Sequence, residues 1–205
     1  MRNKCLLFRT LVSFLALLLP GLAMDAGAQQ RDKRQLEAST TREVRQMEAL
    51  NEEVRHQLVM LPYYSVFDWL QAEVKPDGTV TLMGEAVRPT LKDDAEASVK
   101  KLEQAARVMN NIEVLPLSPM DDDLRIALYR RIYSFDSPLF RYATWSTPPI
   151  HIIVKNGHAA LKGIVANQGD SALAYMAARQ VPGVFDVKNE LQIEQRVDEK
   201  ISRLK

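Results

Sequence analysis

The sequence contains a single cysteine among 205 residues, Cys5, so one chain cannot form an internal disulfide. Cys5 also lies before the apolar run that follows it, which is the wrong side for a lipoprotein acceptor. The stability of the folded protein must therefore come from packed cores and not from a disulfide framework.

Histidines are also few, and none stands in a metal-binding or catalytic pattern. His151 and His158 flank a predicted hairpin, but no cysteine or nearby carboxylate pair completes a zinc site, so we expect solvent-facing or capping roles. The acidic run 121–123 lacks the ligand spacing of a calcium loop and is better explained by helix N-capping. No serine stands in a nucleophile elbow. We therefore expect no enzyme, no cofactor and no metal.

The N-terminal residues have the pattern of a secretory signal peptide. Arg2 and Lys4 precede the run LLFRTLVSFLALLLPGLA, and Ala26-x-Ala28 forms a cleavage signal. We expect cleavage after Ala28 and a periplasmic protein, or an extracellular one if there is no outer membrane. The alternative is an uncleaved membrane anchor, because the apolar run is near spanning length.

Charge of one sign is not in excess. The formal net charge is +1, and removing residues 1–28 lowers Lys+Arg from 27 to 24 and Asp+Glu from 26 to 25. A balance this close to zero provides no bulk attraction to nucleic acid, so we expect no nucleic-acid partner.

The chain contains two copies of one pattern. Gly78 and Gly84 recur as Gly157 and Gly163 at an offset of 79 residues. A second match, between AARVMNNI (105–112) and AARQVPGV (177–184), has an offset of 72. We therefore expect seven additional residues, about two turns, in the second helix of the first copy. Two copies of this size indicate a duplicated small domain.

Each copy shows the order helix, strand, strand, helix, strand. In the first copy, apolar spacing from Val44 to Leu61 predicts a helix that ends near Pro62. Strands are predicted at 63–74, 79–87 and 111–117, with a helix stripe from Ala95 to Met109 between the last two. The second copy repeats the order, with helix stripes at 124–132 and 173–177 and strands at 149–154, 159–166 and 183–194.

The paired glycines are interpreted as structural. The first of each pair follows Asp77 or Asn156 in a hairpin turn and supplies a positive φ. The second shares a strand face with Val80 and Leu82, so we expect a helix backbone to approach the sheet there. The spacing fits no phosphate-binding loop. The glycines interpreted in this way are Gly78, Gly84, Gly157, Gly163 and, in a later turn, Gly183.

Two segments of the second copy carry a family resemblance. They are the hairpin NGHAALKGIVA (156–166) and the segment VPGVFDVKNELQI (181–193), in which Gly183-Val184 leads to Val187-x-Asn189-x-Leu191. These residues resemble a BON domain (bacterial OsmY and nodulation). The first copy departs from the pattern, because Asn111 replaces the turn glycine and Pro116 interrupts the last strand. The resemblance covers residues from about 43 to 195.

The resemblance implies an α+β fold of two tandem αββαβ BON-like domains, each with two helices packed on one face of a three-stranded sheet. The family is associated with envelope proteins, phospholipid surfaces, osmotic or envelope stress, and chaperone-like roles. The expected organisation is a signal peptide (1–28), a flexible segment (29–42), a first domain (43–117), a short hinge (118–120), a second domain (121–195) and a tail forming a short amphipathic helix (196–205).

Two aromatic segments are candidates for binding. We interpret the first, 63–69, as rings that close a small core. The second, 129–145, combines arginine with aromatic residues, which suits a lipid headgroup interface or a protein partner; the alternative is that its rings close the second core. The candidate site residues are Arg130, Arg131, Tyr133, Phe140, Arg141, Tyr142 and Trp145.

We therefore expect a non-enzymatic protein that binds an anionic phospholipid surface. The alternative is a chaperone-like or adaptor protein that binds other envelope proteins.

Overall fold

The computed structural model describes residues 25–194, which fall into two units divided between Arg42 and Glu43. The apolar run of the expected signal peptide and the expected tail helix at 196–205 lie outside the described residues. The described part of the first unit is the beginning of helix α1 (Asp25–Val59), so residues 29–42, expected to be flexible, are helical.

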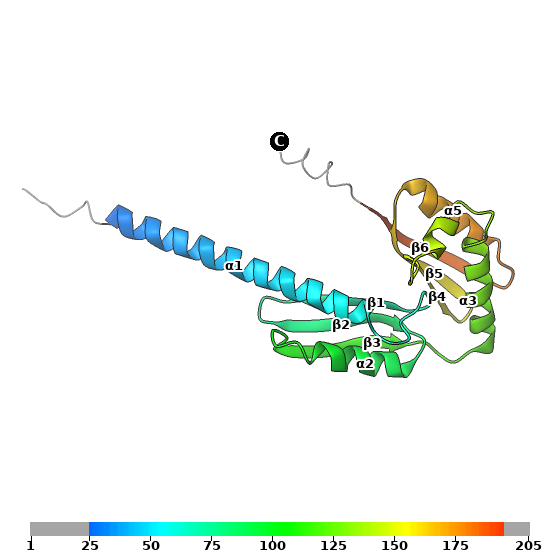
Figure 1. The fold of residues 1–205 in the computed structure, drawn as a ribbon, viewed down its shortest axis with the longest axis horizontal. Coiled ribbons are helices and arrows are strands. Elements are labelled where there is room, and N and C mark those ends of the chain that lie inside the picture. The colour runs from blue at the N-terminus through cyan, green and yellow to red at the C-terminus, as the bar shows by residue number, and fades with distance from the viewer. Residues whose placement is uncertain (1–24, 195–205) are drawn as a thin grey trace, which may run out of the picture. The chain divides into compact units, whose positions relative to one another are not determined.

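The second unit contains two three-stranded sheets with the same topology (Figure 1). In each sheet the first two strands are antiparallel and the second and third are parallel. The α+β fold of two tandem αββαβ domains is therefore confirmed. The first repeat contains the last part of α1, then β1 (Trp69–Val74), β2 (Thr79–Ala86), α2 (Pro89–Val99) and β3 (Arg107–Val114). The second contains α3 (Pro119–Ile132), α4 (Phe140–Ala143), β4 (Ile150–Lys155), β5 (His158–Val165), α5 (Gln168–Arg179) and β6 (Asp186–Ile193).

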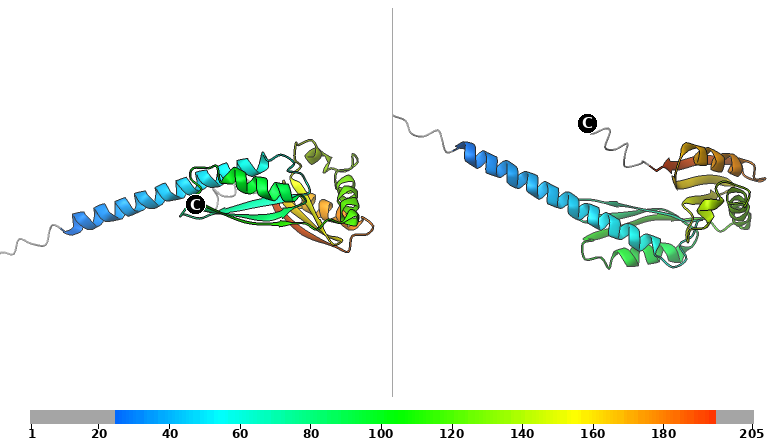
Figure 2. Two further views of the ribbon diagram at one scale, coloured as in Figure 1. Left: turned by 90° about the horizontal axis from the view of Figure 1, so that it is seen from below. Right: turned by 45° about the horizontal axis from the view of Figure 1, so that its top comes forward.

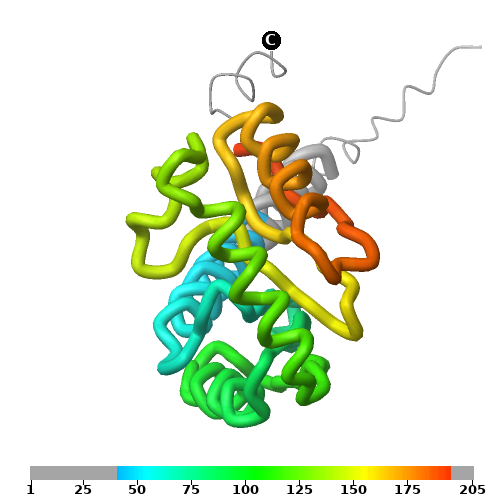
Figure 3. The backbone as a smooth tube through the Cα atoms, turned by 90° about the vertical axis from the view of Figure 1, so that its right-hand side faces the viewer, coloured from blue at the N-terminus to red at the C-terminus, as the bar shows by residue number. Residues whose placement is uncertain are grey.

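Each repeat has its own core on one face of its sheet. In the first, apolar residues of α1 and α2 pack on Val80, Leu82 and Ile112, and both helices lie on the same side of the sheet (Figure 2). In the second, α3 and α5 lie beside each other and cover the corresponding face (Figure 3). Burial of these apolar faces is the main favourable term that holds each layer to its sheet.

The two repeats align at a constant offset of 79 from their second strand to their third. β2 and β5 start at residues 79 and 158, and β3 and β6 start at 107 and 186. The Asn110 amide donates to Lys92 O at 2.9 Å, and the equivalent Asn189 donates to Ser171 Oγ at 2.9 Å. The insertion of seven residues expected from the AAR match is therefore wrong.

The same comparison corrects two element boundaries. The helix predicted up to Met109 ends at Val99, and the strand predicted at 111–117 lies at 107–114. The motif seen in Val187-x-Asn189-x-Leu191 therefore has a counterpart at 108–112, namely Val108-x-Asn110-x-Ile112. Pro116 lies beyond the strand and does not interrupt it. The residue equivalent to Gly183 is Gln104, not Asn111.

Gly84 and Gly163 occupy positions where a side chain has no room. Their φ angles are 120° and 124°. A Cβ at Gly84 would lie 1.9 Å from the carbonyl oxygen of Trp69, and a Cβ at Gly163 would lie 1.9 Å from that of Pro149. The expectation that a helix backbone approaches these glycines is therefore wrong. The close neighbour is the main chain that enters the adjacent strand.

β4 is an edge strand, and three of its outward main-chain groups are engaged by residues of other segments. Ile150 O accepts from the Tyr133 hydroxyl at 2.8 Å, and Val154 O accepts from the Arg125 guanidinium at 2.7 Å. Between them, Ile152 N donates to Val66 O at 2.8 Å. Covering an edge in this way removes a row of unpaired groups that would otherwise attract another strand.

The two repeats contact each other through the sheet faces that carry no helix. Lys162 Nζ lies 2.7 and 2.9 Å from the two carboxylate oxygens of Glu85, and Lys155 pairs with Glu113. The segment 63–68, predicted as strand, is irregular and inserts Val66 into the second core. Its aromatic residues therefore contribute to the junction of the repeats and do not simply close the first core.

The Asp121 carboxylate has a role that the capping interpretation did not include. Ser118 is the N-cap of α3, because its hydroxyl accepts from Asp121 N at 3.2 Å. The buried Asp121 side chain instead accepts from Asn156 N and Gly157 N at 2.9 and 2.8 Å. It thereby ties the start of α3 to the β4–β5 turn.

We predict that Gly163→Ala lowers the free energy of unfolding by about 3 kcal/mol, because it combines a disfavoured φ with a clash against Pro149 O. The matched control is Ile164→Ala, which also places alanine on β5 but at a half-exposed outward position, and which should cost less than about 1 kcal/mol. Urea unfolding of both variants provides the measurement. Equal midpoints for the two variants would contradict the explanation.

Candidate functional site

The connection between the first helix and the first strand differs most between the repeats. It spans residues 60–68 in the first repeat and 133–149 in the second, where it includes α4. The second connection is therefore eight residues longer and contains most of the candidate site residues. Length beyond what closes the fold is typical of a segment with a binding role.

Two of the candidate residues are part of the core. Tyr133 is buried, and its hydroxyl donates to Ile150 O at the edge of β4. Burial raises the pKa of Tyr133, so it remains a neutral donor. Tyr142 is 7% exposed; its hydroxyl donates to Asp170 at 2.7 Å and accepts from Ala166 N at 3.0 Å. These two rings close the second core, as the structural alternative proposed.

Arg141 is held beside this core. Its guanidinium pairs with the buried Asp170 carboxylate and lies over the Tyr142 ring, 4.9 Å from the centroid. The hydrogen bond to the Tyr142 hydroxyl, and then the Asp170 carboxylate, raise the pKa of Arg141. Arg141 therefore remains charged but is already neutralised in part by a carboxylate at the start of α5.

Three aromatic side chains of the connection point away from the core. Phe135 is 82% exposed and Trp145 is 62% exposed, and Phe140 is also exposed. Phe135 and Phe140 form an edge-to-face pair with ring centroids 5.2 Å apart. We refer to Phe135, Phe140 and Trp145 as the exposed aromatic set. Phe135 was not among the predicted site residues, although its position in the aromatic segment could have indicated it.

The three arginines do not form one compact cluster. Arg131 hydrogen-bonds to Gln180 at the end of α5, whereas Arg141 pairs with Asp170 in its first turn. These two contact points are separated by ten residues of helix, about 15 Å. Arg130 is exposed and has no hydrogen bond or ion pair within the described residues. The structure therefore distributes positive charge along the helical face of the second repeat.

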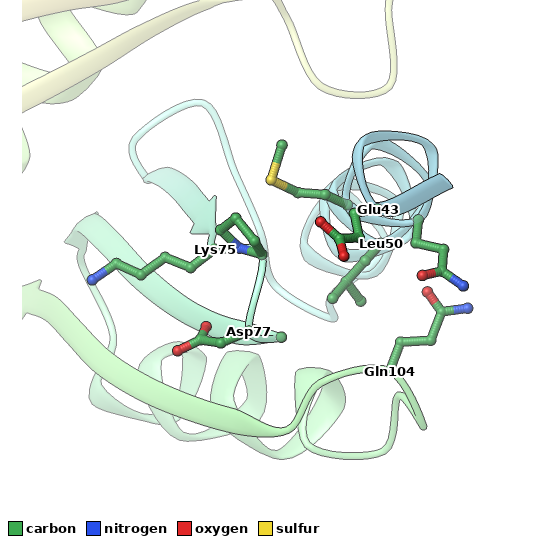
Figure 4. Close-up of a pocket in the computed structure, with 9 residues that line it drawn as sticks. Glu43, Leu50, Lys75, Asp77 and Gln104 are labelled. Carbon is green, nitrogen blue, oxygen red and sulfur yellow. The ribbon is translucent and has the colours of Figure 1, made fainter. Parts of the chain in front are cut away.

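A pocket in the first repeat was not expected from the sequence. It has a volume of about 330 Å³ and lies between α1 and the β1–β2 turn, where Glu43, Leu50, Lys75, Asp77 and Gln104 line it (Figure 4). Asp77 accepts from Thr79 N at 2.9 Å, which lowers the pKa of Asp77 and stabilises the turn. The lining mixes both signs of charge, so it favours no particular ligand.

The histidines do not assemble a site. His158 is exposed and pairs with Asp186, whereas His151 is 6% exposed, so its expected solvent-facing role is wrong. Among the side chains that the structure describes, residues 41–194, no group of three metal-ligating residues could hold an ion. Within the described backbone, residues 25–194, no helix is both long and apolar enough to cross a bilayer.

Comparison with known families identifies the repeated unit. The family model of the BON domain matches residues 48–116 and 139–195, which together cover more than half of the chain. The first segment covers most of the first repeat, and the second covers the second repeat from α4 to β6 but not α3. No curated protein matches the chain.

Solved structures also match the chain, and two of them are of the same protein. One is of CdsD, a structural protein of the type III secretion system of Chlamydia trachomatis; it is 12% identical, with 75% of this chain and 96% of that chain covered, at a TM-score of 0.33. The other is the C-terminal domain of CdsD, also 12% identical, with 71% and 96% covered and a TM-score of 0.26. Similarity at this level carries no argument about function.

We predict that Tyr142→Phe lowers the free energy of unfolding by about 1–3 kcal/mol, because Ala166 N and Asp170 each lose a buried partner. Tyr129→Phe is the matched control, since no hydrogen bond of its hydroxyl is found among the described residues; it should change stability by less than about 0.5 kcal/mol. Thermal or urea unfolding checks both variants. A neutral Tyr142→Phe would show that this hydroxyl does not brace the core.

Proposed function

Because the chain belongs to the BON-domain family, we propose that it binds phospholipid at an envelope membrane, through the exposed aromatic set and neighbouring arginines of its second repeat. The family is typically envelope-associated and generally non-enzymatic. The proposed function is therefore binding without catalysis, in or near the periplasm, and a role in osmotic or envelope stress is consistent with it.

This proposal rests mainly on the connection 133–149, in which some residues anchor the segment to the core and others are exposed. Tyr133 and Tyr142 hold the connection to the core, so the aromatic side chains of the exposed set are presented from an anchored segment. An exposed aromatic ring contributes little favourable free energy in water. At a membrane interface its apolar body is buried, which is favourable. The exposed aromatic set therefore suits insertion among headgroups.

The distribution of the arginines favours a bilayer over a single bound phosphate. Arg131 and Arg141 contact opposite ends of α5, too far apart to grip one phosphate together. A bilayer offers many headgroups, so separated cations can each find one. A basic residue near an anionic surface contributes about 1 kcal/mol, and the contribution fades within a Debye length.

We predict that the double variant Phe135→Ala/Trp145→Ala binds vesicles containing phosphatidylglycerol at least about tenfold more weakly, with an unchanged salt response, because interfacial burial is lost. Flotation of the purified protein with these vesicles measures the binding. Phe185→Ala is the matched control, since Phe185 is 73% exposed but lies outside the connection. The same loss in both variants would remove the specific role of the connection.

Unlike the aromatic variant, an arginine variant should change the salt dependence of vesicle binding. We predict that Arg130→Gln/Arg131→Gln weakens binding about 30-fold at low salt, from about 2 kcal/mol of lost attraction, and flattens the salt dependence. Arg141 is left intact because it pairs with the buried Asp170. Lys100→Gln/Lys101→Gln removes the same charge from the first repeat and should have a smaller effect.

Folding of every variant is checked by circular dichroism. If the parent protein fails to float with either phosphatidylglycerol or phosphatidylcholine vesicles, the membrane proposal is wrong. The chaperone-like or adaptor function, in which the same surface binds other envelope proteins, would then become the better candidate.

A further inference from the structure

The junction of the two repeats contains a buried histidine. His151 lies on the helix-free face of β4, and its ring centroid is 5.1 Å from that of Trp69 and 5.6 Å from that of Tyr64. Both partners belong to the first repeat. The Nδ1 atom of His151 is buried and has no hydrogen-bond partner among the described residues. A buried polar nitrogen without a partner is rare. Protonation of His151 would place a positive charge at this buried position.

The groups that favour a protonated His151 are the main chain of Asp68 and Ser65 and the Asp68 charge, and together they do not offset the effect of burial. The Asp68 carboxylate already accepts from Val87 N at 2.7 Å and from the Ser65 amide and hydroxyl at 3.0 and 2.6 Å. Tyr64 is neutral, because burial raises its pKa to about 12. The aromatic rings of Tyr64 and Trp69 pack against His151 on this side.

The neighbour on the adjacent strand adds a positive charge. Lys162 is the cross-strand partner of His151 on β5, so both side chains project from the same face. Lys162 pairs with Glu85 of β2 and lies 3.7 Å from Glu190 of β6. Glu85 and Glu190 therefore already interact with Lys162, and Asp186 of β6 pairs with His158, so each of these three carboxylates has another partner than His151.

Burial lowers the pKa of His151 below its ordinary 6.5, against a smaller opposing effect from the main chain and charge of Asp68. A lowered pKa means that the closed junction binds the proton more weakly than an open one does. The closed form is therefore fully favoured above pH 6.5 and loses this advantage as the pH falls from 6.5 through the lowered value.

We propose that the contact between the two repeats is pH-sensitive: it closes around neutral His151 and opens when this side chain is protonated. Opening exposes Trp69 and Ile153, the latter only 4% exposed in the closed form. Each pH unit below 6.5 shifts the balance toward the open form by up to tenfold, until the pH reaches the lowered pKa. This inference does not depend on the proposed lipid binding.

The test follows Trp69 as a reporter inside the junction. The chain contains two tryptophans, so Trp145→Phe leaves Trp69 as the single emitter. We expect the emission maximum of the purified protein to move to longer wavelength as the pH falls from 8 to 5, while the far-ultraviolet circular dichroism stays constant. The wavelength is the decisive readout, since a protonated histidine can quench tryptophan intensity without any opening.

Histidine variants assign the transition. His151→Phe should abolish the shift, because the neutral ring cannot be protonated. His158→Phe and His56→Gln, at exposed positions, should retain it. A shift that persists in His151→Phe, a change of intensity without a shift, or a shift that coincides with loss of circular dichroism would each overturn the proposal.

A cross-link provides a second test that does not require replacing His151. Lys155 and Glu113 pair across the junction, so Lys155→Cys/Glu113→Cys in a Cys5→Ser background can be joined by a bis-maleimide cross-linker that contains a reducible disulfide. The cross-linked protein should show no shift, and reductive cleavage of the linker should restore it. If the cross-linked and cleaved forms respond alike, the response does not come from opening of this junction.

Discussion

The contact between a strand-entry carbonyl and a glycine is the constraint on which both repeats depend. The Trp69 and Pro149 carbonyl oxygens lie 1.9 Å from the positions that Cβ atoms of Gly84 and Gly163 would take. Because no side chain fits there, the first strand of each sheet can enter close to the second and keep its register with it. Trp69 and Pro149, whose carbonyl groups make this close approach, also determine which side chains meet at the junction of the repeats. Trp69 faces the junction, and His151 follows Pro149 by two positions and meets Trp69 there.

The edge of β4 explains why the second repeat presents a surface and the first does not. Three groups engage outward main-chain atoms of β4: the Arg125 guanidinium of α3, the hydroxyl of its C-cap Tyr133, and the Val66 carbonyl. Tyr133 begins the long connection and Tyr142 anchors its helix α4 to Asp170, so the connection is fixed near both of these points. Between and after these anchors Leu139 is buried in the core, whereas Phe135, Phe140 and Trp145 are exposed. The exposed aromatic set is the result.

The two repeats have therefore diverged in their connections and not in their sheets. From the second strand to the third, equivalent residues keep one offset, and Asn110 and Asn189 make the same link from the last strand to the preceding helix. The shorter connection of the first repeat inserts Val66 into its neighbour's core, whereas the longer one of the second repeat reaches solvent. The same connection of the fold thus packs against the other repeat in the first copy and forms a candidate binding segment in the second.

The sequence by itself determined the fold class, because apolar periodicity and paired glycines are local signals that each repeat carries in full. It misplaced the end of α2, since the apolar spacing from Ala95 to Met109 continues through a loop into β3. Only the tertiary structure separated Tyr133 and Tyr142 from Phe135 and Trp145. Which rings are buried depends on which main-chain and carboxylate groups remain unpaired at the sheet edge and the start of α5, and those groups come from distant segments. The burial of His151 was decided in the same way, because Tyr64 and Trp69 of the other repeat surround it.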